Sequence, residues 1–335
     1  MIDLHNLIGK TIGVIYTFEG EDAPGFSHYH VWQSDIISKW LNAIQDLKCR
    51  PLIFDVRTFV DKAISRTLPT IDYILNLNCG GCELSPMALI PSVCGFLGIP
   101  CIPCNATAIL AGENKLISNL LAKATGIQVP HNIIDKSDGG IFRPLNLGSS
   151  IGVRRNFTEE TNGIYQEFIK GYDITTPIVY NPISQKMDFM PTVLYISKND
   201  DVEWFLGEEN KESRSGFTRK TIYNMENDVC NKYLELVENM SINTFCRIDA
   251  RIKCDSPQEL SKLLEHPLQL RDLFFIEINP MPTVWINNAF SHSFSEISTS
   301  NSFYDYIKEL QGIVSKCTLH NFLLSISMLS LSRAM

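Results

Sequence analysis

The chain has 335 residues, of which 44% are hydrophobic and 20% are charged, and its formal net charge at pH 7 is -8. A chain of this length and apolar content can bury substantial cores and form two or three domains. The negative net charge argues against a nucleic-acid-binding protein that neutralises phosphates, so small molecules are the expected partners.

The two terminal segments predict a cytoplasmic protein. Residues 1–10 mix polar side chains with few apolar ones, which is not the pattern of a secretory signal peptide. The apolar run over residues 322–331 is interrupted by serines and is too short to cross a bilayer. We therefore expect a packed terminal helix there and no association with membranes.

The first third of the chain alternates apolar strands with helical stretches. The expected strands lie at residues 11–18, 51–55, 71–76 and 98–103, and an amphipathic helix lies at about 30–47. Alternation of this kind is typical of a parallel sheet with helices on both faces. It predicts an N-terminal α/β domain over residues 1–104, whose ligands would bind at the carboxyl ends of the strands.

Two further units are expected after residue 104. Residues 105–190 form the predicted central unit, which begins with a helix at 115–125 and carries a glycine-rich loop. Residues 191–335 form the third unit, in which a helix at 226–240 precedes two strands that carry polar residues. A last helix before the tail is expected at about 302–315.

Residues 244–252, with the sequence TFCRIDARI, form the first of these two strands. Successive side chains of a strand point to opposite faces. Arg247, Asp249 and Arg251 therefore share one face, while the apolar residues between them point to the other. The strand would place a cation and a carboxylate next to each other on one surface.

Residues 274–279, with the sequence FFIEIN, form the second strand. The same alternation places Glu277 and Asn279 on one face together with Phe275. The residues expected on the opposite face are Phe274, Ile276 and Ile278. If the two strands are neighbours, they offer two carboxylates and an amide oxygen to a hard cation such as Mg²⁺, with Arg247 beside it as an anion clamp. From these strands alone, a solvated hairpin face with ion pairs is an equal alternative.

A glycine-serine loop lies earlier in the chain, in residues 141–153, IFRPLNLGSSIGV. Gly148 would let a ligand approach the backbone, and Ser149 and Ser150 supply hydroxyls that suit phosphate oxygens. The loop is neither a Walker A loop, since no Gly-Lys-Ser/Thr follows at the required spacing, nor the GxGxxG dinucleotide fingerprint.

In chain order, these segments resemble the ATP-grasp superfamily, and within it the D-alanine:D-alanine ligase group. The loop that begins at Arg143 is similar to the family's K-P-x-x-x-G-S-S-x-G-V, with arginine in place of the lysine. The residues RID at 247–249 resemble the family's R-x-D, and EINPMP at 277–282 resembles E-x-N-x-x-P-G.

Two weaker matches accompany these three motifs. The residues EFIKGYD at 167–173 resemble the hinge strand that holds adenine and ribose, with aspartate in place of the family's glutamate at the end. Asn114-Lys115 resembles an Asp-Lys pair whose lysine touches an ATP phosphate. Together the matches keep the family's order across residues 11 to about 290.

The resemblance implies an ATP-grasp fold, in which an N-terminal Rossmann-like parallel-sheet domain precedes two α+β subdomains that sandwich ATP. It also implies an ADP-forming ligase that makes amide bonds. A carboxylate would attack the γ-phosphate of ATP to give an acyl phosphate, which an amine would then attack. The expected substrates are a small carboxylate and an amine, in particular amino acids, and the family's habit is a homodimer.

Particular residues receive roles from the resemblance. Two Mg²⁺ ions, or Mn²⁺ in their place, would be held by Asp249, Glu277 and Asn279. Arg247 would stabilise the acyl phosphate and the oxyanion, and it forms the predicted catalytic group together with Ser149 and Ser150. The residues expected to contact ATP are Lys115, Arg143, Gly148, Ser149, Ser150, Glu167, Phe168, Ile169 and Asp173. Among them, Asp173 would accept hydrogen bonds from the ribose hydroxyls.

The sequence departs from the family where the amino-acid substrates would bind. The first-strand loop lacks the family's substrate-binding glutamate, and Thr283 replaces the glycine that follows the last motif. The candidate substrate residues are Ser27, His28, Thr283 and Asn288, with aromatic groups at Trp285 and Phe290. We therefore predict a ligase for an amino acid other than alanine, in a specialised or natural-product pathway. A D-alanine:D-alanine ligase is the alternative, and a nucleotide-binding protein without ligase activity is the second alternative.

A polar segment, 206–222, has the composition of a lid that closes on phosphate. Its basic residues are Lys211, Arg214, Arg219 and Lys220. The family carries a phosphate-contacting lysine here, but the segment does not align well enough to select one. An insertion at 253–272, where the family has a short turn, predicts a surface helix at 257–266.

Ten cysteines require a separate interpretation. The pairs Cys79-x-x-Cys82 and Cys101-x-x-Cys104 have the spacing of a four-cysteine zinc site. The favoured interpretation is that they are small buried thiols in a reduced cytoplasmic protein. A structural zinc ion is the alternative.

Overall fold

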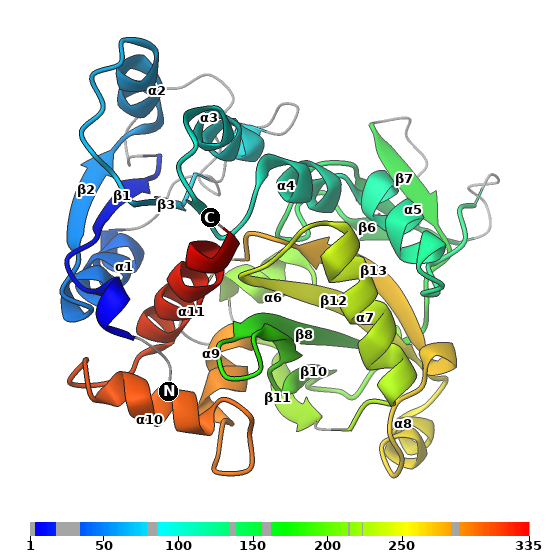
Figure 1. Ribbon diagram of the computed structural model, residues 1–335. Coiled ribbons are helices and arrows are strands. Elements are labelled where there is room, and N and C mark those ends of the chain that lie inside the picture. The colour runs from blue at the N-terminus through cyan, green and yellow to red at the C-terminus, as the bar shows by residue number, and fades with distance from the viewer. Residues whose placement is uncertain are drawn as a thin grey trace.

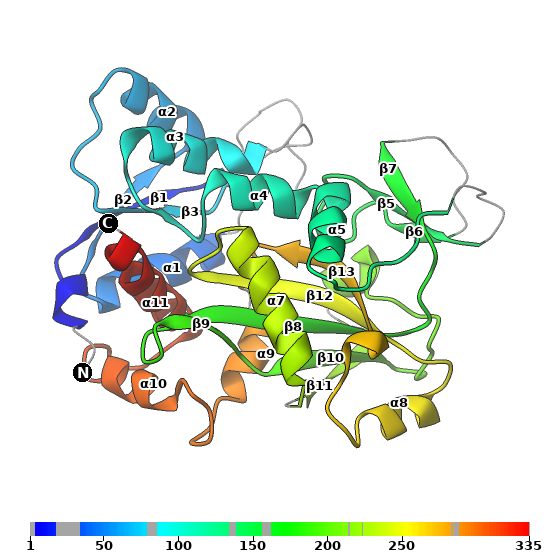
Figure 2. The same cartoon turned by 45° about the vertical axis from the view of Figure 1, so that its right-hand side comes forward.

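The computed structural model describes residues 4–17, 34–78, 86–133, 139–155, 162–213, 215–222, 224–282, 284 and 288–334. These residues form three β-sheets with helices around them (Figure 1). A helix at the C-terminal end lies between the N-terminal sheet and the largest sheet, as Figure 2 shows from a second direction.

The N-terminal sheet has four parallel strands in the order β2-β1-β3-β4. The strands are β1 (Thr11–Ile15), β2 (Arg50–Phe54), β3 (Tyr73–Asn76) and β4 (Cys101–Ile102). The helices are α1 (Ser34–Asp46), α2 (Val56–Ile64) and α3 (Leu89–Leu97), with 3-10 turns η1 (Leu4–Leu7) and η3 (Pro86–Ala88). Each strand overlaps its predicted range, and the predicted α/β fold class is confirmed.

Local chemistry explains where these elements begin and how closely they pack. Asp55 follows β2 directly and caps α2, because its Oδ1 accepts a hydrogen bond from Thr58 N at 2.7 Å. In the centre of β1, a Cβ on Gly13 would come within 2.6 Å of Ile74 Cδ1 on the neighbouring strand. A residue without a side chain therefore allows the close packing of β1 and β3.

The largest sheet has six antiparallel strands in the order β11-β10-β8-β12-β13, with β9 paired to β8. The strands are β8 (Gly171–Asn181), β9 (Lys186–Phe189), β10 (Thr192–Ser197), β11 (Phe217–Ile222), β12 (Phe245–Lys253) and β13 (Leu273–Asn279). Around it lie α6 (Glu208–Ser213), α7 (Asn227–Asn239), α8 (Pro257–Leu263), η5 (Leu270–Asp272), α9 (Ala289–Ser295), α10 (Tyr304–Gln311) and α11 (Leu319–Ala334). The predicted helices at 226–240 and 257–266 correspond to α7 and α8.

A small third sheet, in the order β6-β5-β7, carries the glycine-serine loop between its first two strands. Its strands are β5 (Ile141–Pro144), β6 (Arg154–Arg155) and β7 (Gly163–Gln166), preceded by α4 (Ala106–Glu113) and α5 (Lys115–Ala124). Asn114 caps α5 by accepting a hydrogen bond from Ile117 N at 3.1 Å, so Lys115 is the first residue of that helix.

The two faces of the six-stranded sheet differ in chemistry. On one face, Ile248 and Ala250 pack with the buried side of α7, which lies across β12 and β8 in Figure 2. The strand register places Asp173 opposite Arg251 and Thr175 opposite Asp249 on the other face. This second face, which we call the polar face, therefore collects the charged residues that the sequence predicts for the site.

A β-bulge changes the expected faces of β13. Asp249 pairs with Glu277, whereas Ala250 pairs with Phe275, so Ile276 has no partner on β12. The prediction that Phe275 lies beside Glu277 and Asn279 is therefore wrong. Phe275 is fully buried on the face covered by α7, and Phe274 pairs with Arg251 on the polar face. An extra residue in one strand reverses the alternation beyond it.

The C-terminal helix α11 is buried on all sides from residue 319 to residue 328. Phe322, Leu323 and Leu324 are fully buried and belong to one core with Trp40 of α1 and Phe245 of β12. The predicted packed terminal helix is confirmed. Among the described residues, no helix has the length and apolar character needed to span a bilayer.

His320 of α11 predicts a dependence of stability on pH. Burial, and to a lesser degree Lys39, lower the pKa of this imidazole to about 4, although a hydrogen bond that the imidazole donates to the Val284 backbone opposes the shift. The unfolded chain binds a proton below about pH 6.5, whereas the folded protein does so only below about pH 4. The contribution of the neutral His320 to stability is therefore fully present above pH 6.5, and it is lost as the pH falls from 6.5 towards 4.

We expect unfolding free energy to fall by about 2 kcal/mol from this residue alone between pH 7 and pH 5. The His320→Gln variant should lack that part of the decline, because glutamine does not titrate. Urea denaturation of both proteins at the two pH values measures the difference. Equal declines in the two proteins would contradict the assignment.

Candidate active site

The structure brings together the four residues that the two polar strands predict. On the polar face, Arg247 pairs with Asn279 and Asp249 pairs with Glu277 across β12 and β13. Arg247 Nε donates to Asp249 Oδ2 at 3.2 Å. Both side chains are half-buried, so this surface is a partly buried cluster of cations and carboxylates and not a row of solvated ion pairs.

Asp249 occupies the centre of this cluster. Its Oδ1 accepts a hydrogen bond from Thr175 Oγ1 at 2.6 Å. Burial raises the pKa of Asp249, Arg247 lowers it, and the facing charge of Glu277 raises it further. Two carboxylates directly opposite each other on antiparallel strands repel, and a bound cation would relieve that repulsion.

Glu277 is surrounded by positive charge. Burial alone would raise its pKa, but nearby cations hold the pKa down to about 2, and these are Lys115, Arg143, Lys211 and Arg247. Arg143, which is buried on β5, contacts Glu277 most directly, since its Nη2 donates to Oε2 at 3.2 Å and to Ile276 O at 2.8 Å. Glu277 therefore stays ionised throughout the ordinary pH range.

The beginning of α5 is fastened to the glycine-serine loop. Lys115 N donates to Leu145 O at 2.9 Å, and Lys115 Nζ donates to Leu147 O at 2.5 Å. Asn114 Nδ2 donates to Asn146 Oδ1 at 3.0 Å. Burial lowers the pKa of Lys115 to about 8, partly offset by the negative charge of Glu277. The ammonium is thus held in the cluster and has lost much of its solvation.

The loop itself has an unusual backbone. Ser149 and Ser150 have φ angles of 53° and 62°, in the left-handed region, where side chains cost about 1 kcal/mol or more each. Ile151 N donates to Gly148 O at 3.0 Å and closes a tight turn at these serines. Such a conformation is typical of loops that hold a ligand with backbone amides.

Lys211 is the functional candidate that the sequence did not select. Its Nζ donates to Ser150 Oγ at 2.8 Å, and burial lowers its pKa while Glu277 raises it. Of the other basic residues in this segment, Arg219 lies over the Phe217 ring at 4.8 Å, and Lys220 is on the opposite face of β11. Arg214 lies outside the described residues. Only the packing of α6 against the loop distinguishes Lys211, because no local pattern marks it.

Cations outnumber carboxylates in the described part of this cluster. Lys115, Arg143, Lys211 and Arg247 surround the carboxylates of Asp249 and Glu277. The whole chain, by contrast, carries a net charge of -8. A local excess of positive charge in an acidic protein is suited to a strongly anionic ligand such as a polyphosphate.

Two of the predicted hinge residues, Phe168 and Ile169, contact Arg251. Glu167 Oε1 accepts from His131 N at 2.9 Å, and Ile169 O accepts from Arg251 Nε at 2.7 Å. Phe168 lies under the Arg155 guanidinium, 3.9 Å from the ring centroid. All three belong to the connection between the small sheet and β8.

The last predicted nucleotide contact, Asp173, forms two hydrogen bonds of its own. Its Oδ1 accepts from Arg251 Nη1 at 2.8 Å, and its Oδ2 accepts from Leu206 N at 2.7 Å. Arg251 was visible in the sequence as part of the strand, but its role as the partner of Asp173 was not.

The chemistry of the donor set fits a hard divalent cation. Asp249 and Glu277 supply carboxyl oxygens from facing positions. Asn279 Oδ1 accepts a hydrogen bond from Met281 N at 3.2 Å, which orients the amide and leaves its oxygen a second lone pair. Among the described residues there is no group of three or more His, Cys, Asp or Glu side chains arranged for a metal.

The predicted substrate residues are described only in part. Ser27, His28, Thr283 and Trp285 lie outside the described residues. Asn288 caps α9 through its Oδ1, which accepts from Ser291 N at 3.0 Å. Phe290 is fully buried against Phe245, with ring centroids 6.0 Å apart, so its expected place among the substrate-lining aromatic groups is wrong. The ring belongs to the apolar core because Phe290 lies in the first turn of α9, which packs against the sheet.

Cys101 and Cys104 are buried free thiols. Cys104 Sγ donates to Pro280 O at 3.3 Å. A hydrogen bond of the Cys101 thiol to Cys94, together with burial, raises the pKa of Cys101. The remaining two members of the zinc alternative, Cys79 and Cys82, lie outside the described residues.

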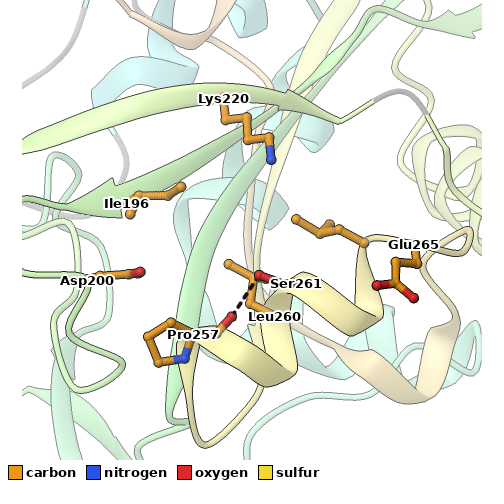
Figure 3. A pocket seen from close by; sticks show the side chains of 8 residues that line it. Ile196, Asp200, Lys220, Pro257, Leu260, Ser261 and Glu265 are labelled. Carbon is orange, nitrogen blue, oxygen red and sulfur yellow. Dashed lines mark hydrogen bonds between the residues drawn. The ribbon is translucent and has the colours of Figure 1, made fainter.

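A separate cavity of about 290 Å³ lies away from this cluster (Figure 3). Leu194 pairs with Lys220 and lies on the face covered by α7, so the Lys220 side of β11 faces away from Asp249. The cavity is formed where α8 packs near β10 and β11. Its lining residues are Ile196, Asp200, Lys220, Pro257, Leu260, Ser261, Leu264 and Glu265.

No protein-family model matches the sequence, and no curated protein matches it at a significant level. Solved structures do match it over almost the whole length. The D-alanine–D-alanine ligase from Bacillus anthracis is 14% identical, with a TM-score of 0.61 over 97% of this chain and 98% of that chain, and the structure of that enzyme complexed with ATP gives the same values.

Two further structures agree. D-alanyl-alanine synthetase A from Vibrio cholerae O1 biovar eltor str. N16961 is 15% identical, with a TM-score of 0.57 over 97% of this chain and 99% of that chain. The VanG D-Ala:D-Ser ligase from Enterococcus faecalis is 12% identical, with a TM-score of 0.56 over 96% and 99%. At such identities the likeness concerns the fold. The chain has the ATP-grasp fold of the D-alanine–D-alanine ligases, as its three motifs predicted.

Proposed function

We propose that the protein is an ATP-dependent ligase that joins a carboxylate to an amine and releases ADP and phosphate. One observation carries the proposal above all others. The facing carboxylates of Asp249 and Glu277 lie within a cluster of cations next to a strained glycine-serine loop. This arrangement suits a metal-bound polyphosphate, and it occurs on a fold that has been solved with ATP in another protein.

The nucleotide phosphates would bind between the small sheet and the polar face. Lys115 and Arg143 would hold the phosphates from the α5 side, and Lys211 from the α6 side. Gly148, Ser149 and Ser150 would cover them, and Glu167, Phe168 and Ile169 would line the nucleoside end. Asp249, Glu277 and Asn279 would hold Mg²⁺, which when bound neutralises phosphate charge.

The chemistry has two steps. A carboxylate oxygen of the first substrate attacks the γ-phosphorus, and the bond to the ADP oxygen breaks. The amine of the second substrate then attacks the acyl carbon, and phosphate leaves as the amide forms. Arg247, next to Asn279, would stabilise the oxyanion between these events, a contribution of about 3 kcal/mol for one well-placed donor.

The substrate proposed is an amino acid other than alanine, in a specialised or natural-product pathway. The support is the sequence, which lacks the substrate-binding glutamate of the first-strand loop and carries Thr283 in place of a glycine. A D-alanine:D-alanine ligase is the second candidate, favoured by the names of the matching structures. A nucleotide-binding protein without ligase activity is the third, and the intact cluster around Glu277 weighs against it.

Incubation with ATP, Mg²⁺ and pools of L- and D-amino acids and simple carboxylates tests the function. Phosphate release and product masses are read for the wild type and for Glu277→Gln. Amide and ADP from the wild type alone would establish a ligase and name its substrates. Activity with D-alanine alone would promote the second candidate, and ATP binding with no product from any pool would favour the third.

Lys115 gives the proposal a dependence on pH. Its pKa is about 8 in the free protein because burial disfavours the cation, whereas a bound polyphosphate favours it. The contribution of the Lys115 charge to nucleotide affinity is therefore fully present below pH 8, and it is lost as the pH rises above 8. We expect Mg-ATP affinity to fall about eightfold between pH 7.5 and pH 9.

Calorimetric titration with a non-hydrolysable ATP analogue at both pH values measures this effect. The Lys115→Arg variant is the control, because a guanidinium stays charged at pH 9. Its affinity should change little over the same interval. A wild-type affinity that is constant up to pH 9 would contradict the role of Lys115.

We also propose a cytoplasmic homodimer. The eight described cysteines are all free, which supports a reducing compartment. Large apolar side chains are exposed along α4 and α5, including Leu110, Ile117 and Leu120. Leu120→Glu is expected to give a monomer in light scattering, whereas Ile64→Glu, at an exposed position on α2, should leave the dimer intact. A dimer in both variants would place the interface elsewhere.

A further inference from the structure

Arg251 is a buried arginine whose three guanidinium nitrogens all donate hydrogen bonds. Its side chain is about 4% exposed, and the hydrogen bonds that it donates reach Ile169 O at 2.7 Å, Gly171 O at 2.7 Å and Trp204 O at 3.0 Å. Its ion pair with Asp173, at 2.8 Å, is the one salt bridge it makes within the described part of the chain. A buried guanidinium needs a counter-charge to stay in the fold, so Asp173 is committed to Arg251.

The second oxygen of Asp173 fixes the backbone of the following segment. Leu206 N donates to Asp173 Oδ2 at 2.7 Å, and Leu206 O accepts from Ser150 Oγ at 2.9 Å. Gly171 N donates to Val202 O at 2.8 Å, so residues 202–206 run back across the start of β8. Leu206 therefore lies between Asp173 on the polar face and the glycine-serine loop on the small sheet.

These contacts give Asp173 a structural task at the place where a ribose would bind. Aspartate is shorter by one methylene than the glutamate expected there, and its carboxylate holds both the Arg251 guanidinium and the 202–206 backbone. With these bonds in place, only the remaining lone pairs of the carboxylate are open to another donor. A shift of the carboxylate towards a ribose would leave Arg251 without its counter-charge and Leu206 N without its acceptor. A charge-assisted hydrogen bond to a ribose hydroxyl is the kind of contact that discriminates tenfold or more.

We propose that Asp173 does not form hydrogen bonds with the ribose hydroxyls and that the nucleotide site binds 2′-deoxyATP as tightly as ATP. The proposal rests on the proposed function, since it concerns the same nucleotide. Asp173 and Arg251 then form a clamp that fixes the 202–206 segment as a wall of the nucleoside end. The protein then recognises the nucleotide through its base and its phosphates.

Calorimetric titration of the full chain with Mg-ATP and with Mg-2′-deoxyATP tests the proposal. The two dissociation constants are expected to agree within about threefold, against the tenfold or more of a charged ribose contact. Tighter binding of ATP by tenfold or more would overturn this inference and leave the proposed function standing. Binding of neither nucleotide would overturn both.

Asp173→Asn separates a structural task from a ribose contact. If the clamp is right, this variant lowers the melting temperature and leaves the ratio of the two affinities unchanged. Selective loss of ATP affinity at an unchanged melting temperature would overturn the proposal. Should the variant not fold, the comparison of the two nucleotides on the wild type still decides the matter.

Discussion

Replacing Glu277 by glutamine is expected to lower the turnover of the proposed ligase reaction by about a thousandfold. Glutamine keeps the shape of the side chain but removes the charge around which Lys115, Arg143 and Lys211 gather. It also removes one of the two facing carboxylates proposed for the metal. Losses of 10²- to 10³-fold follow the removal of a single preorganised electrostatic group, and here two functions are lost together.

The measurement is ADP formation with the substrates that the pool assay identifies. Glu265→Gln is the matched control, since Glu265 is an exposed glutamate on the far side of the sheet, at the cavity of Figure 3. It should change turnover by less than a factor of about two. The melting temperature of each variant shows whether the fold is retained. Turnover of Glu277→Gln within threefold of the wild type would remove Glu277 from the active site.

Arg251→Met is expected to have the largest effect on stability, a loss of about 3–5 kcal/mol. Methionine keeps much of the apolar volume, but it leaves the half-buried Asp173 without its cation. The carbonyls of Ile169, Gly171 and Trp204 lose their donor at the same time. A buried charge whose partner has been removed is the most destabilising feature that one substitution can create here.

Urea denaturation monitored by fluorescence gives the free energy of unfolding. Arg271→Met serves as the control, because this arginine precedes β13 with its side chain about 81% exposed and lies 4.0 Å from Asp272. An exposed pair of this kind contributes little, so the control should lose less than about 1 kcal/mol. A loss of similar size for Arg251→Met would show that the clamp is not a stabilising element.

Much of the candidate site is readable from the sequence because its signals are local. Alternation in the 244–252 strand places Arg247 and Asp249 on one face, and the glycine-serine loop is marked by composition alone. The order of these segments along the chain was enough to indicate the ATP-grasp fold. Where the pattern failed, as at Phe275, one bulged residue had shifted the alternation.

The remaining parts of the site depend on contacts between distant residues. Lys211 reaches Ser150 across 61 positions of the chain, and Arg251 reaches Asp173 across 78. A basic residue in a polar segment has the same local signature whether it meets a phosphate site, an aromatic ring or solvent, as Arg219 illustrates. Sequence pattern cannot distinguish these outcomes.

By itself, the sequence determined most of the elements, the α/β fold class and the polar face of the 244–252 strand, because these follow from the period of apolar residues and from backbone preferences within a few positions. That the two polar strands pair with each other was decided by the tertiary structure. The tertiary structure alone decided which lysine joins the cluster, which carboxylate is committed to a buried arginine and which face Phe275 occupies. These outcomes depend on electrostatics and packing between residues that are distant in the sequence, and such contacts form only in the folded protein.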